Sequence, residues 1–374
     1  MAYKIKILFD SYHLYHLPQF EPLIDLLSMD KRFDIFHSTS NEIPIQEYEL
    51  CSSILSKKSG IFVEAKTEKI RQKKIKSLNL DFFICGWSRY DIDKYVTRKT
   101  IVGMIYHGIG IKPSYWLDNH KRLDIRFVEG EYRVQQLKQN KVETRLELTG
   151  FIKMDPIFQK GKIDIKSIQQ KYNLDSSKKT VLFAPTFYPS SIEPIGTRLG
   201  EYTKGFNVLI KPHLWTTFLK NFAEINHRRK NRIFNDLIRN YDHIHLISPE
   251  DYNIIPFYKV ADVLLTEASS TIYEMLACGK PVIVNRFFKL KLSHRLFRHR
   301  LYKRRLNQEM ENDISSFCFE AYKPNDIPLA LEKAFNQFSS KKDKIKEYQK
   351  KMLFKLDGLA ASRAKEVILS YKTN

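Results

Sequence analysis

Short apolar stretches alternate with longer amphipathic stretches over the first 150 residues of the chain. The apolar stretches have the length and composition of buried strands, and they occupy residues 4–10, 33–39, 60–65, 80–86, 99–108, 124–130 and 144–150. Segments with helical spacing, such as QFEPLIDLLSM and TEKIRQKKIKSLN, lie between them. This order of strand, loop and helix predicts a parallel sheet that is covered by helices on both faces.

A second series of the same kind follows a polar, basic stretch of sequence. Its apolar stretches occupy residues 180–187, 206–213, 243–249, 261–267 and 280–285. The chain has 374 residues, more than a single hydrophobic core usually supports. We therefore predict an α/β fold of two Rossmann-like, doubly wound domains, residues 1–155 and 156–350, with a cleft between them. The helix-forming residues 351–374 are expected to pack back on the first domain.

Polar residues directly follow several of the predicted strands. His107 and Gly108 follow IVGMIY, Thr186 follows VLFAP, and Lys211 and His213 end the stretch VLIKPH. Ligands of open α/β sheets bind beyond the carboxyl ends of the strands, so these positions predict a binding site.

The sequence ADVLLTEASSTIYEMLACGKPVIV places a cluster of polar side chains where a strand passes into a helix. Ser269, Ser270 and Thr271 lie at the predicted helix start, where unpaired backbone N–H groups favour an anion. A capping box formed by a hydroxyl and Glu274 explains the same pattern. Because His107, Thr186 and His213 lie at matching strand ends, we interpret the cluster, together with Glu267, as a site for a nucleotide and its phosphates.

Several histidines are candidates for proton transfer or for charge neutralisation. The imidazole of His107 can accept the proton of an attacking hydroxyl, and a protonated His213 would neutralise charge on a leaving nucleotide. His13 and His16 lie in the first loop and are expected to shape an acceptor pocket, with Lys112 as a further candidate on the acceptor side. A structural role at a strand end is the alternative for each histidine.

The chain carries 63 Lys and Arg residues against 42 Asp and Glu residues, a formal net charge of +21. This excess predicts an acidic partner: a phosphorylated small molecule, an anionic membrane surface or nucleic acid. Residues 286–305 are rich in basic, aromatic and aliphatic side chains and contain no acidic one. We favour membrane binding through Arg295, Arg298, Arg300, Lys303, Arg304 and Arg305. A basic cleft wall and a nucleic-acid patch are the alternatives, the latter disfavoured because no nucleic-acid-binding motif accompanies the segment.

Other features of the sequence bear on location and cofactors. The four cysteines are widely spaced, no stretch approaches the roughly 18 consecutive apolar residues of a membrane span, and the first residues lack the features of a signal peptide. We therefore expect a cytoplasmic protein that associates peripherally with the inner face of the cell membrane. The sequence shows no credible metal-binding motif and demands no cofactor.

The motifs YHGIGIKPSYW, LTGFIKMDPIF, VLFAPTFYP, LIKPHLW and ADVLLTEASSTIYEMLACGKPVIV occur in this order along the chain. Together they resemble the CDP-glycerol glycerophosphotransferase family, whose members synthesise teichoic acids and related capsule polymers on a GT-B fold. Of the family block TG-x-P-R-x-D, the chain keeps Thr149, Gly150 and Asp155. The chain departs from the family at Phe187, which follows APT in place of tryptophan and arginine, and at Ala268, which replaces tyrosine.

The resemblance implies a role for several of the candidate residues. His107 is the base that activates the acceptor, His213 and the hydroxyls of residues 269–271 surround the CDP pyrophosphate, and Glu274 lies near the ribose. The implied reaction transfers glycerol phosphate or another polyol phosphate from a CDP-linked donor to a hydroxyl of a lipid-linked glycan. The alternatives are a GT-B glycosyltransferase with a CMP- or UDP-sugar donor, and a non-catalytic basic protein that binds membranes or polyanions.

Overall fold

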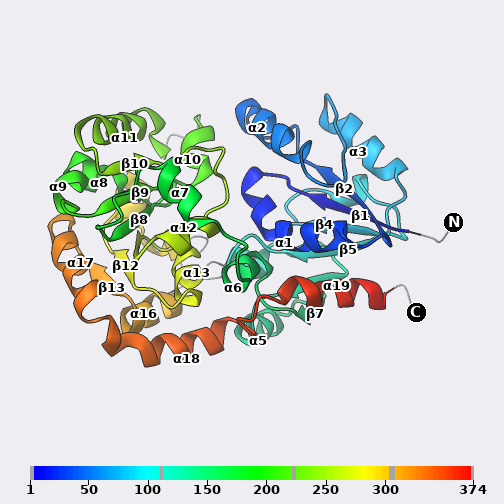
Figure 1. The fold of residues 1–374 in the computed structure, drawn as a ribbon. Helices are drawn as coiled ribbons and strands as arrows, with labels where there is room; N and C mark the ends of the chain where they lie inside the picture. The colour runs from blue at the N-terminus through cyan, green and yellow to red at the C-terminus, as the bar shows by residue number, and fades with distance from the viewer. Residues whose placement is uncertain (1–3, 110–112, 221–224, 303–307, 372–374) are drawn as a thin grey trace. The chain divides into compact units, whose positions relative to one another are not determined.

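The computed structural model describes residues 4–109, 113–220, 225–302 and 308–371. Within them the chain forms two compact units, each built on one parallel sheet flanked by helices (Figure 1). The first unit contains residues 4–108, 114–159 and 350–371, and the second consists mainly of residues 160–349. The two parallel sheets confirm the predicted α/β fold.

The first sheet has seven strands among the described residues, in the order β3-β2-β1-β4-β5-β6-β7. All neighbouring strands are parallel. Each strand overlaps one of the apolar stretches of the sequence. The strands are β1 (Ile5–Asp10), β2 (Phe33–Ser38), β3 (Ile61–Phe62), β4 (Phe82–Cys85), β5 (Ile101–Ile105), β6 (Ile125–Val128) and β7 (Arg145–Leu148).

The second sheet has six strands in the described part of the chain, in the order β10-β9-β8-β11-β12-β13, and is also parallel throughout. Its strands are β8 (Thr180–Ala184), β9 (Asn207–Ile210), β10 (Ile244–Leu246), β11 (Val263–Thr266), β12 (Val282–Asn285) and β13 (Phe319–Ala321). The sequence pattern did not predict β13, whose three residues FEA are too short to form an apolar stretch.

Helices connect the strands in both units. Those of the first unit are α1 (Leu17–Ser28), α2 (Ile45–Leu55), α3 (Glu68–Ser77), α4 (Ser114–Leu117), α5 (Glu131–Gln139), α6 (Asp155–Phe158) and α19 (Ala360–Ser370). Those that begin in the second unit are α7 (Ile165–Lys171), α8 (Ile192–Ile195), α9 (Leu199–Tyr202), α10 (Leu214–Phe218), α11 (His227–Asn240), α12 (Ile255–Val260), α13 (Thr271–Ala277), α14 (Leu292–Leu296), α15 (His299–Tyr302), α16 (Gln308–Phe317), α17 (Ile327–Asn336) and α18 (Lys342–Met352).

The C-terminal helix α19 contacts α1 and is held by residues of the motif LTGFIKMD. The Asp155 carboxylate accepts hydrogen bonds from the backbone N–H groups of Ala360 and Ala361 over 3.1 and 2.7 Å. These donors lie at a helix start, where such groups favour an anion. Gly150 has a φ of +92°, and a Cβ at this position would lie 2.7 Å from the carbonyl oxygen of Phe354. The motif therefore fastens the C-terminal segment to the first unit.

The strand order of each sheet reverses at one place. In the first sheet the reversal brings β1 beside β4, and in the second it brings β8 beside β11. Loops that leave such neighbouring strands run to opposite faces of the sheet and leave a crevice, which is where doubly wound folds bind ligands. The loops that follow these four strands are therefore the first places to look for a site.

Candidate active site

Imidazole and aromatic rings cluster at the carboxyl ends of β1, β4 and β5 in the first unit. This histidine cluster consists of His13, Tyr15, His16, Trp87, Tyr106 and His107. His16 lies at its centre, with its ring centroid 4.5 Å from that of Tyr15, 4.8 Å from that of His107 and 5.1 Å from that of Trp87. Because β1, β4 and β5 are neighbours in the sheet, three loops that are distant in sequence meet here.

The ring of His107 is oriented by the backbone of Gly86, the residue that follows β4. Its Nδ1 lies 3.0 Å from the carbonyl oxygen of Gly86, and Tyr106 stacks on the ring with 4.4 Å between centroids. A carbonyl oxygen only accepts hydrogen bonds, so Nδ1 carries the proton and Nε2 of the neutral ring carries the lone pair. His107 is partly exposed. Its tautomer and exposure are those that a general base requires.

His16 is fully buried, and neither of its ring nitrogens has a hydrogen-bond partner in the described structure. A Cβ on Gly86 would lie 2.7 Å from Cγ of His16, so a glycine is needed for the ring to reach the end of β4. Burial, together with the neighbouring His107 and His13, holds the pKa of His16 well below its usual value. The ring is therefore neutral at physiological pH.

Glu47 of α2 holds the first loop in place. Its fully buried carboxylate lies 3.1 Å from Nδ1 of His13 and accepts the backbone N–H of Leu14 over 3.1 Å. His13 and His16, predicted as acceptor-side residues, thus lie in one cluster with the predicted base. Gly108 is buried beside His107, and the predicted candidate Lys112 lies outside the described residues.

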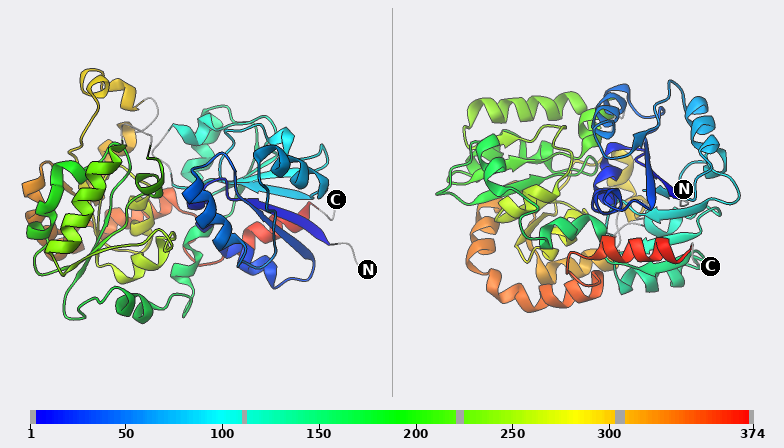
Figure 2. Two further views of the ribbon diagram at one scale, coloured as in Figure 1. Left: turned by 90° about the horizontal axis from the view of Figure 1, so that it is seen from above. Right: turned by 45° about the vertical axis from the view of Figure 1, so that its right-hand side comes forward.

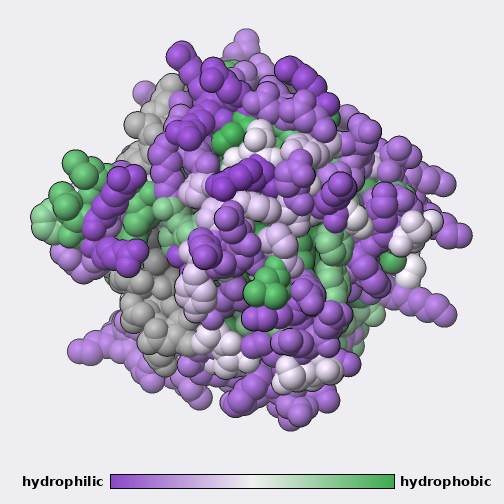
Figure 3. All heavy atoms as spheres, turned by 90° about the vertical axis from the view of Figure 1, so that its left-hand side faces the viewer, coloured by the Kyte–Doolittle hydropathy of each residue, from purple (hydrophilic) through white to green (hydrophobic). Residues whose placement is uncertain are grey.

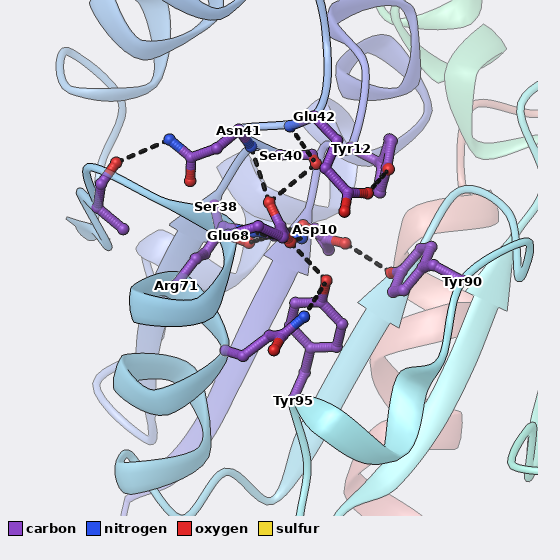
Figure 4. Close-up of polar contacts among 12 residues, drawn as sticks. Asp10, Tyr12, Ser38, Ser40, Asn41, Glu42, Glu68, Arg71, Tyr90 and Tyr95 are labelled. Carbon is purple, nitrogen blue, oxygen red and sulfur yellow. Dashed lines mark hydrogen bonds and ion pairs between the residues drawn. The ribbon is translucent and has the colours of Figure 1, made fainter.

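A second polar group lies at the carboxyl ends of β1 and β2 (Figure 4). The fully buried guanidinium of Arg71 contacts Asp10 over 2.6 Å and Glu68 over 2.5 Å. Asp10 also accepts a hydrogen bond from the hydroxyl of Tyr90 over 2.5 Å, and the Tyr90 ring stacks on Tyr12 with 5.0 Å between centroids. A buried charge is tolerated only when it is paired, so this buried network fixes the rings beside the histidine cluster.

In the second unit, Glu267 joins the loops that follow β8 and β11. Its fully buried carboxylate accepts the backbone N–H groups of Thr186 and Ser191, each over 2.7 Å, and the Ser191 hydroxyl over 2.6 Å. Burial raises the pKa of Glu267 to about 7, although the hydrogen bonds from Ser191 and Thr186 and the charge of Lys230 oppose this rise. Both carboxylate oxygens are engaged by the chain, so Glu267 positions these loops.

The hydroxyls of residues 269–271 gather at the start of α13. Ser269, Ser270 and Thr271 are partly exposed. The Ser269 hydroxyl accepts the backbone N–H of Thr271 over 3.3 Å, and the Thr271 hydroxyl lies 3.1 Å from that of Thr266. The Ser270 side chain does not cap the helix, so the capping box considered from the sequence is not formed. A single helix cap needs one hydroxyl and therefore does not explain why three lie at this position.

The other candidates of the second unit differ in exposure. Glu274 is fully buried and accepts a hydrogen bond from the hydroxyl of Tyr258 over 2.8 Å, and Lys211 is also buried. His213 is partly exposed, and its Nδ1 accepts the backbone N–H of Trp215 over 3.1 Å at the start of α10. Nε2 of the neutral His213 ring therefore carries the proton. This tautomer is opposite to that of His107 and offers a hydrogen-bond donor to an anion.

The described part of the basic segment, residues 286–302, includes α14 and α15. Arg295, Arg298 and Arg300 are exposed, and so are Leu292 and Leu296, at 69% and 67%. The segment projects from the second unit (Figure 2, left, gold), and Figure 3 shows hydrophobic and hydrophilic side chains next to one another on a projection at its left. The predicted membrane-binding residues Lys303, Arg304 and Arg305 lie outside the described residues.

The beginning of the basic segment packs on the loop that follows β8. The backbone N–H of Lys289 donates to the carbonyl oxygen of Ser190 over 3.0 Å, and the Tyr188 hydroxyl lies 2.8 Å from Nδ1 of His294. The same loop carries Thr186, whose hydroxyl donates to the carbonyl oxygen of Pro189. The segment therefore braces a candidate nucleotide-binding loop at one end and is exposed at the other.

The sequence analysis did not identify several residues that complete the histidine cluster of the first unit and the Glu267 loops of the second. Trp87 directly follows the stretch DFFICG, so the strand-end argument would have found it had it been applied to that strand. Glu47 and Arg71 lie on helices with ordinary patterns, and no local signal distinguishes them. In the second unit, Asn285 ends β12 and donates from its side-chain amide to the Ser191 hydroxyl over 3.0 Å.

Two further properties concern the described residues only. They contain no group of three or more His, Cys, Asp or Glu side chains placed to hold a metal ion. They also contain no helix that is both long and apolar enough to cross a membrane.

Comparison with known proteins gives a family match and a set of structural neighbours. Residues 116–290 match the model of the CDP-Glycerol:Poly(glycerophosphate) glycerophosphotransferase family. No curated protein sequence matches the chain. A variant of the wall teichoic acid polymerase TagF superimposes with a TM-score of 0.72 at 12% identity, covering 98% of this chain and 89% of that chain.

Two nucleotide-bound structures are also similar to this chain. The S. aureus MnaA–UDP co-structure has a TM-score of 0.65 at 14% identity, covering 99% of this chain and 97% of that chain. UDP-GlcNAc 2-epimerase from Neisseria meningitidis bound to UDP-GlcNAc has a TM-score of 0.62 at 15% identity, covering 98% of this chain and 100% of that chain. The architecture is thus that of the GT-B fold, and the resemblance to the CDP-glycerol glycerophosphotransferase family is confirmed by the match over residues 116–290.

Proposed function

We propose that this protein is a transferase that moves glycerol phosphate, or another polyol phosphate, from a CDP-linked donor to an acceptor hydroxyl in teichoic-acid or capsule synthesis. The observation that carries the proposal is the family match over residues 116–290. That span contains Thr186, Lys211, His213 and the hydroxyls of residues 269–271. The fold of TagF, named as a wall teichoic acid polymerase, supports the same reaction class.

The second unit holds the donor in this proposal. Charge on a departing nucleotide must be neutralised by groups that are already in place. The hydroxyls of the partly exposed Ser269, Ser270 and Thr271 donate hydrogen bonds to the pyrophosphate oxygens, and the Nε2–H of His213 adds a further donor. Lys211 and the loop that carries Thr186 extend this phosphate site. Glu267 and Glu274 are buried, so they act by positioning the loops and the helix that surround the nucleotide.

The first unit supplies the base. His107 lies outside the matched span, so its role rests on the geometry of the histidine cluster. The oxygen of the acceptor hydroxyl attacks the β-phosphorus of the donor, and its proton passes to Nε2 of His107. The bond between the β-phosphorus and the bridging oxygen breaks, and CMP leaves with the bonding electrons. Polyol phosphate is thereby joined to the acceptor through a phosphodiester.

The acceptor is proposed to be a lipid-linked glycan at the inner face of the cell membrane. The exposed Arg295, Arg298 and Arg300 would attract anionic headgroups, each contributing about 1 kcal/mol. The exposed Leu292 and Leu296 would enter the interface between headgroups and acyl chains. The protein would thus be cytoplasmic and peripheral on the membrane.

The reaction is proposed to need no divalent cation, because hydroxyls, histidine and lysine supply the donors that the leaving CMP requires. Turnover should therefore survive treatment with EDTA. Loss of turnover in EDTA that is restored by Mg²⁺ would show that this part of the proposal is wrong.

A glycosyltransferase with a nucleotide-sugar donor is the second candidate, favoured by the similarity in fold to the structures bound to UDP and to UDP-GlcNAc. A donor screen separates the candidates. The protein is incubated with CDP-glycerol, CDP-ribitol, CMP-sugars and UDP-sugars, and the released nucleotide is identified. CMP release from a CDP-polyol supports polyol-phosphate transfer, whereas UDP release supports the second candidate. No release and no nucleotide-dependent thermal shift would indicate a non-catalytic binding protein.

A further inference from the structure

Three buried ring nitrogens of the histidine cluster lack a hydrogen-bond partner in the described structure. They are Nε1 of Trp87 and both nitrogens of His16. The two residues are 8% and 0% exposed. Buried polar groups are almost always paired in native proteins, and an unpaired one lowers stability. Unpaired groups that persist beside a candidate base therefore point to a ligand that supplies the missing partners.

Aromatic rings that are partly open to solvent surround these nitrogens. The Tyr15 ring meets His16 edge-on at 4.5 Å, and the Tyr12 ring lies 5.3 Å from Trp87. Tyr12 and Tyr15 are partly exposed, and rotation of the Tyr15 side chain would admit a ligand hydroxyl to the nitrogens beneath. Flat apolar faces with a few polar atoms at their edges suit a ligand that has C–H faces and hydroxyls.

The charges around the rings argue against an anionic ligand. Arg71 is paired with Asp10 and Glu68. Arg89, which lies over the Trp87 ring at 4.8 Å, is paired with Asp118 over 2.8 Å. Both guanidinium groups near the rings are thus already neutralised by carboxylates.

The hydrogen-bonding character of the unpaired groups points to hydroxyls. The indole N–H only donates, and a neutral imidazole has one donor and one acceptor. Hydroxyls both donate and accept, so two or more of them can satisfy all three nitrogens, whereas a phosphate oxygen cannot satisfy the imidazole acceptor. A sugar ring combines several hydroxyls with an apolar face of the right kind for stacking on tyrosine.

We propose that Tyr12, Tyr15, His16 and Trp87 form a subsite for the terminal sugar ring of the acceptor. Tyr15 also contacts His107, with 5.1 Å between ring centroids, so a sugar held against Tyr15 presents its hydroxyls beside the base. The buried network fixes Tyr12 in advance through Tyr90. This inference rests on the proposed function for the role of His107, and it specifies the substrate class: the acceptor ends in a sugar, not in an open-chain polyol phosphate.

Binding of simple sugars to the full chain tests the subsite directly. The chain has three tryptophans, so the indole N–H resonances of ¹⁵N-labelled protein can be resolved. Trp87→Phe identifies the Trp87 resonance and removes the N–H donor together with part of the indole ring, and Trp116→Phe on α4 is the matched control. The probes are methyl glycosides of glucose, N-acetylglucosamine and N-acetylmannosamine, with glycerol and inorganic phosphate as comparison ligands.

The Trp87 resonance should shift with at least one methyl glycoside and not with glycerol or phosphate. Trp87→Phe should raise the Kd for that glycoside at least about fivefold, the effect of losing one neutral hydrogen bond, and Trp116→Phe should leave it unchanged. A Trp87 resonance that no glycoside moves overturns the subsite. One that moves equally with glycerol or phosphate overturns the assignment to a sugar ring.

The donor screen and the sugar titration test the proposed function and the sugar subsite independently. If no CMP is released from any CDP-polyol while the Trp87 resonance responds to sugars, the proposed function is wrong and the sugar subsite stands. If CMP is released while the Trp87 resonance does not respond, only the subsite is wrong.

Discussion

The carbonyl oxygen of Gly86 holds the ring of His107 through Nδ1, over 3.0 Å. A residue that follows β4 thereby fixes the tautomer of a side chain that follows the neighbouring strand β5, and Nε2 carries the lone pair of the neutral ring. The same glycine also gives His16 the space it occupies against the end of β4. A substitution at His107 therefore tests the chemistry of the site more cleanly than one at Gly86, which would disturb both histidines.

His107→Ala should lower kcat by on the order of 10²–10⁴-fold, the usual contribution of a general base. Binding of CDP-glycerol, measured by calorimetry, should remain close to that of the wild type because the donor is assigned to the second unit. His245→Ala, on the edge strand β10, is the matched control and should keep full turnover. Full turnover in His107→Ala would remove His107 from the mechanism.

His213→Gln should retain more activity than His213→Ala. A glutamine amide can still offer an N–H donor to the departing CMP, whereas alanine offers none, and one hydrogen bond to a charged group is worth about 1.5–3 kcal/mol. The loss in kcat/KM for CDP-glycerol should therefore be at least about tenfold larger for alanine than for glutamine. Equal losses in the two variants would show that His213 does not act as a donor.

Glu267 should make the stability of the protein depend on pH. The folded state raises the pKa of Glu267 from 4.5 to about 7, so between these values it binds more protons at this site than the unfolded state does. The contribution of Glu267 is therefore fully present below about pH 4.5 and is lost as the pH rises through 7.

Urea unfolding at pH 5 and pH 8 measures this effect. The wild type should lose more unfolding free energy over this range than Glu267→Gln, with a slope difference of at most about 1.4 kcal/mol per pH unit. The exposed Glu250→Gln should follow the wild type. Parallel pH profiles for the wild type and Glu267→Gln would contradict the assigned titration.

Arg71→Met should lower the unfolding free energy by about 3–5 kcal/mol, because the variant leaves the buried Asp10 carboxylate without its cation. The double variant Arg71→Met, Asp10→Asn should recover part of the loss, since the second change removes the uncompensated charge. Lys73→Met, an exposed change on the same helix, is the control. A double variant as unstable as the sum of its single changes would show that the two residues are not coupled.

Much of the fold was predictable because strands of parallel sheets are buried on both faces and read as continuous apolar stretches. Twelve of the thirteen described strands overlap such stretches. β13 was missed because its central residue is Glu320, which breaks the apolar run. With only three residues, the strand is too short to show an apolar stretch on its own.

The candidate site was predictable only where it depends on strand ends. His107, His13 and His16 were found in this way and lie together in the structure. The direction in which a strand-end side chain points cannot be read from the sequence, and Glu267 and Glu274 point into the protein. Arg71 reaches Asp10 from a helix far along the chain, and no local pattern records a contact of that kind.

If the protein binds the membrane through Arg295, Arg298 and Arg300, their contributions to the binding free energy should be additive. The triple alanine variant should bind phosphatidylglycerol vesicles on the order of a hundredfold more weakly than the wild type, at about 1 kcal/mol for each basic residue. Neither protein should bind phosphatidylcholine vesicles. Alanine at the exposed Arg228, Arg229 and Arg232 of α11 removes the same charge and should have little effect. Equal losses in the two triple variants would assign binding to overall charge and not to the projecting segment.

The central claim is that the β-phosphorus of the donor moves with the polyol. CDP-glycerol labelled with ³²P at the β-phosphorus, incubated with the protein and a lipid-linked glycan fraction, tests this claim most directly. The account predicts label in the glycan fraction and an equal amount of unlabelled CMP. Label that appears in released CDP, with glycerol alone on the acceptor, would contradict it.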